Sequence, residues 1–442
     1  MLCLKRGLQR RRDATMKILV TGATGLIGSA VAACLTREGH QVIGIARRPH
    51  PYLKIAGWVR FDVASATQPE QWLPLLGNIE AVINCAGVLQ DSVRENTEGV
   101  HAAGPGALFL ACEKSGVRRV IHLSAVGVDR AQPSAFSASK YAGDRQLMAR
   151  DLDWVILRPS VVLGRSVFGG SALIRALASL PLVPLMPNTQ PLQVVQLEDV
   201  LKTISFFLKP DAPSRIALEL VGPDRLQMAE IIAQYRSWCG WPPARYFTLP
   251  HGLSRFLYRV GDLAGFLGWR PPVRTNAARE IARGAIGDPE PWITLCGIRP
   301  RSLRDALTVE PASVQDKWFA PLYLIKPILV VVLSAFWIGT GLISLTVGYQ
   351  VGVDLMRSTG AGTLSEPAVL TGALADIGVG VGVAWRPLTR YGLYGGLALS
   401  LFYAVAGTVL RPDLWIDPLG ALLKIFPIFV LHMVALAILD ER

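Results

Sequence analysis

Residues 17–28 read Lys-Ile-Leu-Val-Thr-Gly-Ala-Thr-Gly-Leu-Ile-Gly, and the rest of the chain is organised around this stretch. Ile18–Val20 is the apolar run of a buried strand, and glycines spaced three residues apart follow it. In such a turn Gly22 allows a sharp bend, and Gly25 leaves no Cβ between the backbone and a phosphate. Gly28 lets the next helix pack close to the strand. The stretch therefore predicts a strand-to-helix turn that can hold a pyrophosphate.

The sequence around these glycines fits a nucleotide-binding unit. An amphipathic helix is predicted over 26–36 and a second strand over 41–46, which gives the order strand, turn, helix, strand. The N-terminus of such a helix offers unpaired N–H groups to phosphate. A glycine triplet also occurs in ordinary tight turns, but this order favours phosphate binding. The residues predicted to contact a cofactor here are Thr21, Gly22, Ala23, Thr24, Gly25, Leu26, Ile27 and Gly28.

The motif Thr-Gly-Ala-Thr-Gly-x-x-Gly resembles the TGxxGxxG signature of extended and atypical short-chain dehydrogenase/reductases. The resemblance extends over about residues 16–310, and it is closest to the atypical, complex-I-subunit-like branch. It implies an α/β fold, a doubly wound parallel-sheet Rossmann domain that binds NAD(P). Some members of that branch bind NADPH without demonstrated turnover.

The composition indicates that part of the chain lies in a membrane. Of 442 residues, 51% are hydrophobic and 18% are charged, with a mean hydropathy of +0.36. The net charge of +12 could indicate nucleic acid as a partner, but no zinc-finger spacing or RNA-binding motif supports that. Basic flanks of membrane segments explain the charge, so no nucleic-acid partner is expected.

Three regions are predicted from the length and from this change of composition. Residues 1–15 are a basic extension without an apolar run, so they are either disordered or a start-site error before Met16. Residues 16–315 form the NAD(P)-binding domain, and 316–442 the membrane domain. The six cysteines are scattered without a Cys-x-x-Cys pair, which predicts buried thiols in a reducing compartment and no metal site.

Paired arginines favour NADP(H) over NAD(H) as the cofactor. Arg47 and Arg48 follow the second predicted strand, where an acidic residue would select NAD and an arginine accommodates the 2′-phosphate of NADP. The alternative is an ordinary solvated basic turn. A third strand is predicted over 59–63, and the resemblance assigns Asp62 to the adenine amino group and Val63 to the adenine ring.

The strand predicted over 81–84 opens into an element that resembles the family's Asn-x-Ala-Gly. Its small residues let the backbone run against the cofactor, which assigns Asn84, Ala86 and Gly87 to cofactor binding. A helix is expected over about 101–115. Further on, an Arg-Pro-x-x-Val-x-Gly segment resembles the strand that turns towards the nicotinamide, and it adds Arg158, Pro159 and Val161.

The catalytic residues of the resembled family are a Ser that polarises the substrate oxygen, a Tyr that transfers the proton, and a Lys four residues later. The resemblance assigns Ser124 and Lys140 to the first and third roles; a hydroxyl that only closes a strand is the alternative for Ser124. The tyrosine position holds Phe136, which has no ionisable hydroxyl. Tyr141 lies about 100° further round the helix than Lys140, so it should not point in the same direction as Lys140. Either Tyr141 or another acid replaces the missing group, or proton transfer is impaired.

Residues 165–315 are expected to form the lobe that covers the substrate, with an amphipathic helix over 228–239. Residues 194–200 resemble the family's Val-His-Val-x-Asp-Val element, with Gln196 in place of the His. The lobe is rich in aromatic residues, which either line an apolar pocket or form the lobe's own core. These residues are Trp241, Tyr246, Phe247, Phe256, Tyr258, Phe266 and Trp269.

After Pro321 the chain predicts a membrane domain that resembles the DoxX-like four-helix family. The four runs of spanning length are 322–347, 368–385, 391–410 and 419–439. The loop 386–390 carries two arginines and no acid, so it should be cytoplasmic. Four spans then place both termini and the NAD(P)-binding domain on the cytoplasmic side of the cell (inner) membrane.

Three polar residues fall inside the predicted spans: Asp376, Lys424 and His432. Such groups normally face the interior of a bundle. They could form a quinone or proton site, or they could serve interhelical hydrogen bonds, with Lys424 reaching the membrane surface. Glycines spaced for close helix contact occur as Gly378-x-x-x-Gly382 and Gly392-x-x-x-Gly396.

Three functions remain open from the sequence. The first is a membrane-anchored NADP(H)-dependent oxidoreductase or epimerase-like enzyme acting on an apolar or membrane-delivered substrate, with a quinone or lipid-like small molecule as a candidate. The second is an NADPH-binding scaffold or sensor with little turnover, which Phe136 favours. The third, electron transfer from NADPH to quinone, ranks last because the sequence carries no flavin or metal motif.

Overall fold

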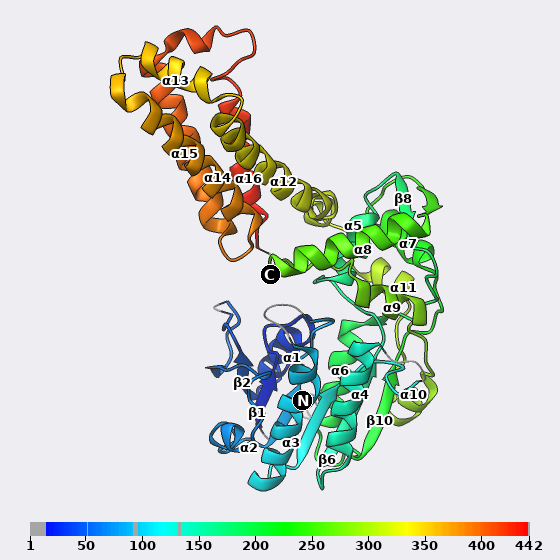
Figure 1. Ribbon diagram of the computed structural model, residues 1–442. Helices are drawn as coiled ribbons and strands as arrows, with labels where there is room; N and C mark the ends of the chain where they lie inside the picture. The colour runs from blue at the N-terminus through cyan, green and yellow to red at the C-terminus, as the bar shows by residue number, and fades with distance from the viewer. Residues whose placement is uncertain (1–14, 51, 92–95, 131–133, 441–442) are drawn as a thin grey trace, which may run out of the picture. The chain divides into compact units, whose positions relative to one another are not determined.

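The computed structural model describes residues 15–50, 52–91, 96–130 and 134–440 (Figure 1). Except for residue 15, the predicted extension lies outside the described residues. The chain forms two compact units. The first comprises Met1–Asp262 and Pro271–Ser313, and the second comprises Leu263–Arg270 and Val314–Arg442.

A parallel sheet of seven strands forms the centre of the first unit. Its order is β10-β6-β5-β4-β1-β2-β3, so the chain starts in the middle and winds outward in both directions, as predicted for a doubly wound fold. The order reverses between β1 and β4, where Thr21 is in register with Asn84. Ligands of such folds bind outside the carboxyl ends of the strands at this reversal. The strands are β1 Lys17–Thr21, β2 Gln41–Ala46, β3 Gly57–Arg60, β4 Ala81–Asn84, β5 Arg119–Leu123, β6 Asp153–Pro159 and β10 Ile216–Leu220.

Both faces of the sheet are buried, which is why its strands read as continuous apolar runs. Ile18 and Val20 pack with α1, α6 and Trp292 of α10 on one face. Leu19 points the other way and packs with α2, α3 and α4. The helices on the two faces are α1 Leu26–Arg37, α6 Leu197–Phe207 and α10 Glu290–Cys296, and α2 Pro69–Trp72, η1 Leu73–Leu75, η2 Gly99–Ala103, α3 Gly104–Ser115 and α4 Ala135–Met148.

The lobe after β6 has a core of its own, in which Ile231, Ile232 and Tyr235 of α7 are fully enclosed. The predicted helix over 228–239 is α7, and it ends one residue earlier. Two short parallel strand pairs, β7 with β9 and β8 with β11, hold the lobe's loops. The elements are β7 Val162–Leu163, α5 Gly170–Leu177, β8 Leu182–Leu185, β9 Val195–Gln196, α7 Met228–Trp238, β11 Arg245–Thr248, α8 His251–Phe266, α9 Thr275–Arg283 and α11 Leu303–Val309.

One predicted boundary was wrong. The third strand ends at Arg60 instead of residue 63, because Asp62 starts a turn in which its Oδ1 accepts the N–H of Ala64 at 3.2 Å. The helix expected over about 101–115 ends at Ser115, and it includes a π-helical turn, η2 Gly99–Ala103, that continues into α3. Gly104 sits at the junction with no room for a side chain, since a Cβ there would overlap the carbonyl oxygen of Val63.

The second unit is helical, and three of its segments are long and apolar enough to cross a membrane: Val314–Leu345, Gly362–Ala384 and Thr389–Leu410. The predicted fourth span over 419–439 was wrong in extent, because 421–424 form turns and α16 has 13 residues. Lys424 therefore lies before this helix rather than inside it. The elements are α12 Val314–Leu345, α13 Tyr349–Ser358, η3 Gly362–Leu364, α14 Ser365–Ala384, α15 Thr389–Leu410, η4 Pro412–Trp415 and α16 Ile425–Ala437.

Glycines allow close helix contacts in this bundle, but not at every predicted position. A Cβ on Gly392 of α15 would lie 2.6 Å from the carbonyl carbon of Gly382 on α14, and a Cβ on Gly396 would overlap the ring of His432. Gly378, in contrast, faces open space. The predicted close approach of helices is therefore made by three of the four glycines.

Candidate functional site

The glycine turn has the geometry that its sequence predicts. Gly22 has a φ of +62°, and a Cβ on it would lie 2.8 Å from the backbone nitrogen of Ala86. The N–H of Gly25 donates to the carbonyl of Gly22 at 2.8 Å, and Gly25 is the N-cap of α1, without a side-chain cap. A Cβ on Gly28 would overlap the carbonyl oxygen of Gly22. The start of α1 is thus packed tightly against the end of β1. Backbone groups, and not side chains, occupy the N-terminal end of α1.

Asn84 connects the ends of three strands at the reversal point. The Oγ1 of Thr21 donates to Asn84 Oδ1 at 2.5 Å, and the N–H of Ala86 donates to the same oxygen at 3.3 Å. Its Nδ2 lies 2.9 Å from Nδ1 of His122 on β5. The Asn84 side chain is fully buried, and both its Oδ1 and its Nδ2 have partners within the protein. Asn84 therefore positions the backbone of residues 85–87 and does not point its amide toward a ligand.

A chain of buried polar groups continues from this point into α4. Because Asn84 donates to Nδ1 of His122, the proton of that ring lies on Nε2, 3.4 Å from Oδ1 of Asp144. Burial lowers the pKa of His122, so its ring is neutral. Burial alone would raise the pKa of Asp144, but its contacts with His122 and Arg158 outweigh burial and hold that pKa below the ordinary value. The predicted cofactor residue Arg158 thus has its guanidinium on Asp144, at 3.0 Å, and on Asp129.

Lys140 joins the ends of β4 and β5. Its Nζ donates to the carbonyl oxygen of Leu123 at 2.8 Å and to that of Ala86 at 3.3 Å. A Cβ on Gly87 would lie 3.3 Å from the same ammonium, which explains the glycine there. Burial lowers the pKa of Lys140 to about 8, although Asp144 acts in the opposite direction. The amine is therefore close to its titration point at neutral pH, in a place next to the glycine turn.

Ser124 follows Leu123 directly, so the structure brings two predicted catalytic residues together. Its N–H donates to the carbonyl of Leu157 at 2.8 Å, which fixes the backbone between β5 and β6. The side chain is 6% exposed, and its Oγ makes no well-formed hydrogen bond among the described residues, although it lies close enough to the carboxyl of Asp144 to help lower that group's pKa. A bound ligand can supply a better partner for this buried hydroxyl.

Phe136 lies one helical turn before Lys140 on α4 and packs against His101. The two rings meet edge to face with centroids 5.4 Å apart. His101 accepts the N–H of Val88 on Nε2 at 3.0 Å, and its Nδ1 lies 2.8 Å from Oγ of Ser139. Burial and the nearby ammonium of Lys140 hold the pKa of His101 well below its ordinary value. The site therefore contains a neutral imidazole beside the position where the family has a tyrosine.

The remaining predicted cofactor residues lie at the carboxyl ends of their strands. Arg47 and Arg48 follow β2 directly and are exposed, and Asp62 is exposed in the turn after β3 while Val63 is buried. Pro159 ends β6, and the carbonyl of Val161 accepts the N–H of Val195 at 3.0 Å. All of these residues thus belong to the edge of the sheet at which the glycine turn lies, which is the placement that cofactor binding requires.

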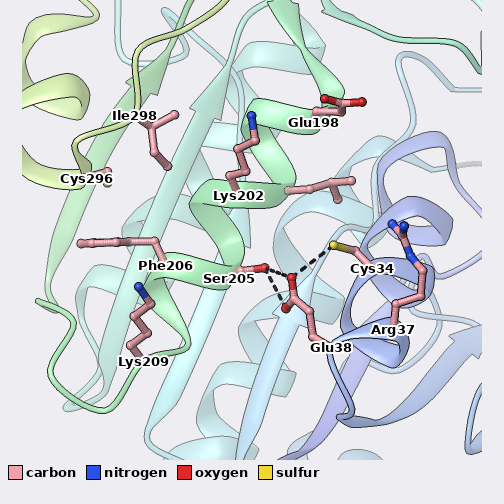
Figure 2. Close-up of a pocket in the computed structure, with 11 residues that line it drawn as sticks. Cys34, Arg37, Glu38, Glu198, Lys202, Ser205, Phe206, Lys209, Cys296 and Ile298 are labelled. Atoms are coloured by element: carbon pink, nitrogen blue, oxygen red, sulfur yellow. Dashed lines mark hydrogen bonds between the residues drawn. The ribbon is translucent and has the colours of Figure 1, made fainter. Parts of the chain in front are cut away.

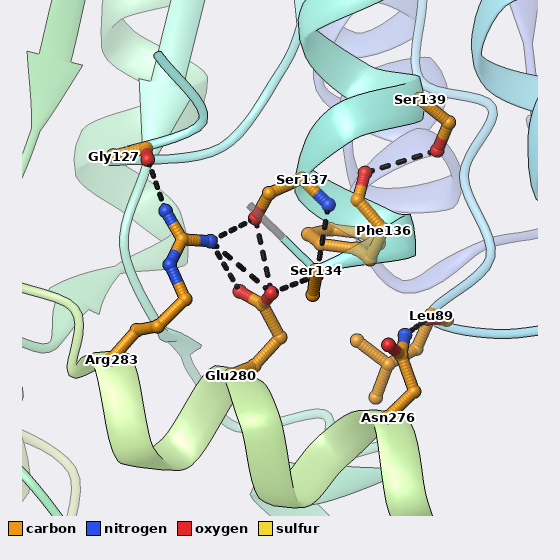
Figure 3. A network of polar contacts seen from close by, with 9 residues as sticks. All are labelled: Leu89, Gly127, Ser134, Phe136, Ser137, Ser139, Asn276, Glu280 and Arg283. Atoms are coloured by element: carbon orange, nitrogen blue, oxygen red, sulfur yellow. Dashed lines mark hydrogen bonds and ion pairs between the residues drawn. The ribbon is translucent and has the colours of Figure 1, made fainter. Parts of the chain in front are cut away.

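Helix α9 of the lobe is held against the start of α4 by a polar network (Figure 3). Glu280 accepts from Ser137 Oγ at 3.0 Å and pairs with Arg283 at 3.3 Å, and it also accepts from Ser134. Arg283 donates to the carbonyl of Gly127 at 2.5 Å. The lobe therefore closes on the loop after Ser124 and on the first turn of the helix that carries Phe136.

A cavity of about 500 Å³ lies away from this edge, between α1, α6 and the segment around Ile298 (Figure 2). The lining residues that α1 contributes, Cys34 and Arg37, lie near the C-terminal end of this helix, whereas the glycine turn lies at its N-terminal end. The Oγ of Ser205 lies 3.0 Å from both carboxylate oxygens of Glu38 and donates its single proton to that carboxylate, and the thiol of Cys34 donates to Glu38 at 3.5 Å. Burial and Glu38 raise the pKa of Cys34, so its thiol is not activated. Nothing here marks a second nucleotide site.

The polar residues of the bundle make interhelical hydrogen bonds. Tyr403 of α15 donates to Asp376 of α14 at 2.9 Å, and Trp337 of α12 donates to Nε2 of His432 on α16 at 2.9 Å. Nδ1 of His432 lies 2.8 Å from the carbonyl oxygen of Ile428. Lys424 is exposed. This geometry favours the structural alternative, and a quinone or proton site at these residues stays a prediction.

The sequence prediction omitted four residues that the structure brings to the site: His101, His122, Asp144 and Glu280. A signal existed for Asp144, because it lies four residues after Lys140 and so on the same face of α4. His122 stands inside the buried strand β5, where a histidine requires a partner. No sequence signal could place Glu280, since it comes from the lobe about 140 residues later.

Comparison with known proteins separates the two halves of the chain. Residues 18–209 match the NAD dependent epimerase/dehydratase family, and residues 334–433 match the DoxX-like family. The chain therefore joins a domain that is similar to the NAD dependent epimerase/dehydratase family to one that is similar to the DoxX-like family. This confirms the predicted fusion and the fold class of the first unit.

The curated relatives that are similar to part of this chain include the following three. An uncharacterized protein of Mycobacterium tuberculosis is 26% identical over 219 residues, which are 49% of this chain and 23% of that protein, so this chain spans less than a quarter of its length. A ceramide reductase of Caulobacter vibrioides is 25% identical over 54% of this chain and 75% of the relative. The rat NADH dehydrogenase (ubiquinone) 1 alpha subcomplex subunit 9 is 29% identical over 64% of this chain and 76% of the relative.

A solved structure supports the fold. MoeE5 in complex with UDP-glucuronic acid and NAD superposes with a TM-score of 0.52 and 21% identity. The superposition covers 66% of this chain and 96% of MoeE5. It confirms the predicted Rossmann-like fold.

Proposed function

We propose that the protein is a membrane-anchored, NADP(H)-dependent oxidoreductase or epimerase-like enzyme that acts on an apolar or membrane-delivered substrate. The observation that carries the proposal is the juxtaposition of Ser124 and Lys140 at the end of β5, beside the glycine turn of residues 21–28. Burial lowers the pKa of Lys140 to about 8, which supports a role in proton transfer beyond its hydrogen bonds to the carbonyls of Ala86 and Leu123.

The residues at the sheet edge fit a nicotinamide dinucleotide. The uncapped start of α1 offers backbone N–H groups to the pyrophosphate, and Gly22 and Gly28 leave no room for side chains there. Arg47 and Arg48 would meet the 2′-phosphate of NADP(H), and Asp62 with Val63 would meet the adenine. When bound, the cofactor supplies or accepts a hydride at its nicotinamide ring. MoeE5, which has a similar fold, is described in complex with NAD, so the preference for NADP(H) rests on the arginines alone.

Proton transfer must use a group other than a tyrosine at position 136. Two of the three N–H bonds of the Lys140 ammonium are donated to the carbonyls of Ala86 and Leu123. The third remains for a ligand, and a pKa near 8 suits an amine that gives up or takes a proton near neutral pH. Ser124, whose buried Oγ makes no well-formed hydrogen bond among the described residues and lies near the carboxyl of Asp144, would polarise the substrate oxygen.

Several features support a lipid-like substrate at the cytoplasmic side of the cell membrane. One relative is named a ceramide reductase, and ceramide is a lipid. The DoxX-like domain and three apolar helices would keep such an enzyme where an apolar substrate is concentrated. Two arginines in the loop between α14 and α15 favour a cytoplasmic location of that loop and of the cofactor.

The alternative is an NADPH-binding scaffold or sensor with little turnover, which rests on Phe136 at the tyrosine position. One experiment separates the two functions. The full chain, purified in nanodiscs, is titrated with NADPH and with NADH by fluorescence, and NADPH oxidation is then measured with a membrane lipid extract. Binding with lipid-dependent oxidation supports the enzyme, binding without oxidation by any lipid fraction supports the scaffold, and absence of binding contradicts both.

A further inference from the structure

Helix α8, His251–Phe266, leaves its large apolar side chains exposed. The exposed fractions are 60% for Phe256, 45% for Val260 and 63% for Leu263. Leu253 and Leu257 are exposed as well, and spacings of three and four residues put all five side chains on one face of the helix. Neither sequence alternative for the lobe's aromatics holds for Phe256, because it belongs to no core and lines no described pocket.

The opposite face of α8 is small and polar, and this face is the buried one. Ser254, Gly261 and Gly265 are buried, and a Cβ on Gly261 would overlap the carbonyl oxygen of Val273. Asp262 accepts from Nε of Arg274 at 3.1 Å. A helix that only served the lobe would bury its apolar face. The reversed arrangement means that the apolar face is arranged for contact with something else.

The charges beside the apolar face are positive. Arg255 and Arg259 are exposed along one flank. Asp262 is the single acidic residue between 251 and 270, and it is paired with Arg274. An apolar face with basic flanks is the pattern of helices that lie in the plane of an anionic membrane surface.

The chain that follows α8 is packed into the end of the helical bundle. Residues 263–270 belong to the second unit, where Nε1 of Trp269 donates to the carbonyl of Ala384, the last residue of α14, at 2.8 Å. The N–H of Arg386 donates to the carbonyl of Leu267 at 2.9 Å, and the guanidinium of Arg386 lies 5.3 Å from the ring centre of Trp269. Tryptophan and arginine at the end of a spanning helix mark the level of the lipid headgroups. The C-terminal end of α8 therefore reaches that level.

We propose that α8 is a membrane-surface helix. Its apolar face, formed by Leu253, Phe256, Leu257, Val260 and Leu263, inserts between lipid chains, and Arg255 and Arg259 contact anionic headgroups. The occupant is the lipid surface rather than a protein partner, because the apolar face is continuous in the chain with a segment packed on a membrane-spanning bundle. The proposal rests on the membrane insertion of that bundle, and it adds a second, peripheral contact that the spans do not predict.

Depth-dependent fluorescence quenching tests the proposal on the full chain. An environment-sensitive fluorophore is attached to Val260→Cys, and the protein is reconstituted in vesicles of phosphatidylcholine and phosphatidylglycerol. Val405→Cys, exposed within α15, serves as the control for bundle insertion, and Glu70→Cys, exposed on α2, serves as the control for solvent. The unsubstituted protein, treated with the same reagent, gives the contribution of the native thiols.

The expected result is a blue-shifted emission at Val260 and loss of most of its fluorescence when nitroxide-labelled lipid is included, with no such loss at Glu70. Two double variants should abolish lipid quenching of the fluorophore at position 260 and leave lipid quenching at position 405 unchanged. In the first, Phe256 and Leu263 are replaced by Gln; in the second, Arg255 and Arg259 are replaced by Glu. Quenching at Val405 but only aqueous iodide quenching at Val260 would overturn the proposal. So would energy transfer between labelled copies without lipid quenching, which would assign the face to a second copy. Absence of lipid quenching at Val405 would instead overturn the insertion of the bundle.

Discussion

The ring of Phe136 packs edge to face on the imidazole of His101, with their centroids 5.4 Å apart. One turn further along α4, Lys140 donates to the carbonyl of Leu123 at 2.8 Å. The position of the family's tyrosine is thus a packing position in this protein, whereas the lysine keeps a buried polar role. This arrangement separates the ability to bind a cofactor from the ability to transfer a proton, and each can be tested alone.

Restoring the tyrosine should raise turnover. In Phe136→Tyr the new hydroxyl lies on the same helix face as Lys140, whose ammonium would lower the phenol's pKa. General acid catalysis is worth on the order of 10²-fold or more, so we expect kcat of NADPH oxidation with lipid substrate to rise at least about tenfold. Tyr141→Phe is the matched control and should leave kcat unchanged. An unchanged kcat in Phe136→Tyr would show that proton transfer does not limit the reaction.

The glycine turn should not tolerate a single methyl group. Gly22→Ala places a Cβ 2.8 Å from the nitrogen of Ala86 and forces alanine to a φ of +62°, which costs about 1–2 kcal/mol before the clash is counted. We expect NADPH affinity to fall at least about tenfold, measured by fluorescence titration. Gly77→Ala is the control, because a Cβ there meets nothing within 4 Å. Equal affinities of the two variants would contradict a pyrophosphate site at this turn.

The Rossmann fold could be predicted from the sequence because the patterns that indicate it lie within one short segment. The apolar run ending at Thr21, the glycines and the following helix all belong to one short segment, so their arrangement does not depend on the rest of the fold. The sequence could not place Glu280 on Ser137 or His122 near Asp144, because those contacts depend on how distant segments pack. The same limit applies to α8, whose amphipathic pattern predicts a helix but not which face is exposed.

The arginines after β2 should decide the cofactor preference. An Arg–phosphate contact is charge-assisted and worth about 1.5–3 kcal/mol, so Arg47→Ala with Arg48→Ala should weaken NADPH binding about 10- to 100-fold and leave NADH binding unchanged. Arg118→Ala is the control, since Arg118 lies before β5 and hence at the opposite edge of the sheet. If the double variant keeps its NADPH-to-NADH affinity ratio, the pair is only a solvated turn.

Histidine 432 offers a test of the two interpretations of the bundle. His432→Leu removes the acceptor of the Trp337 N–H, and an unsatisfied buried donor costs about 1–3 kcal/mol, so the unfolding temperature of the protein in detergent should fall. His432→Gln can retain an acceptor and should lose less. If instead both variants keep the unfolding temperature and both lose activity with an added quinone, His432 belongs to a ligand site.

The pH dependence of stability should report the buried state of Lys140. Its pKa is about 8 in the folded protein and 10.5 in an exposed lysine, so between these values the unfolded chain holds a proton that the folded chain has released. The free energy of unfolding therefore rises as pH increases from about 8 to about 10.5, by about 3 kcal/mol in total, and does not change through this group below pH 8. Lys140→Met removes the titrating group. We expect the stability difference between wild type and Lys140→Met, measured by denaturant unfolding, to grow with pH over this range, while tyrosines and thiols titrate equally in both proteins. A difference that stays constant would mean that the ammonium is solvated in the folded state, and Lys140 would then no longer be a candidate proton donor at neutral pH.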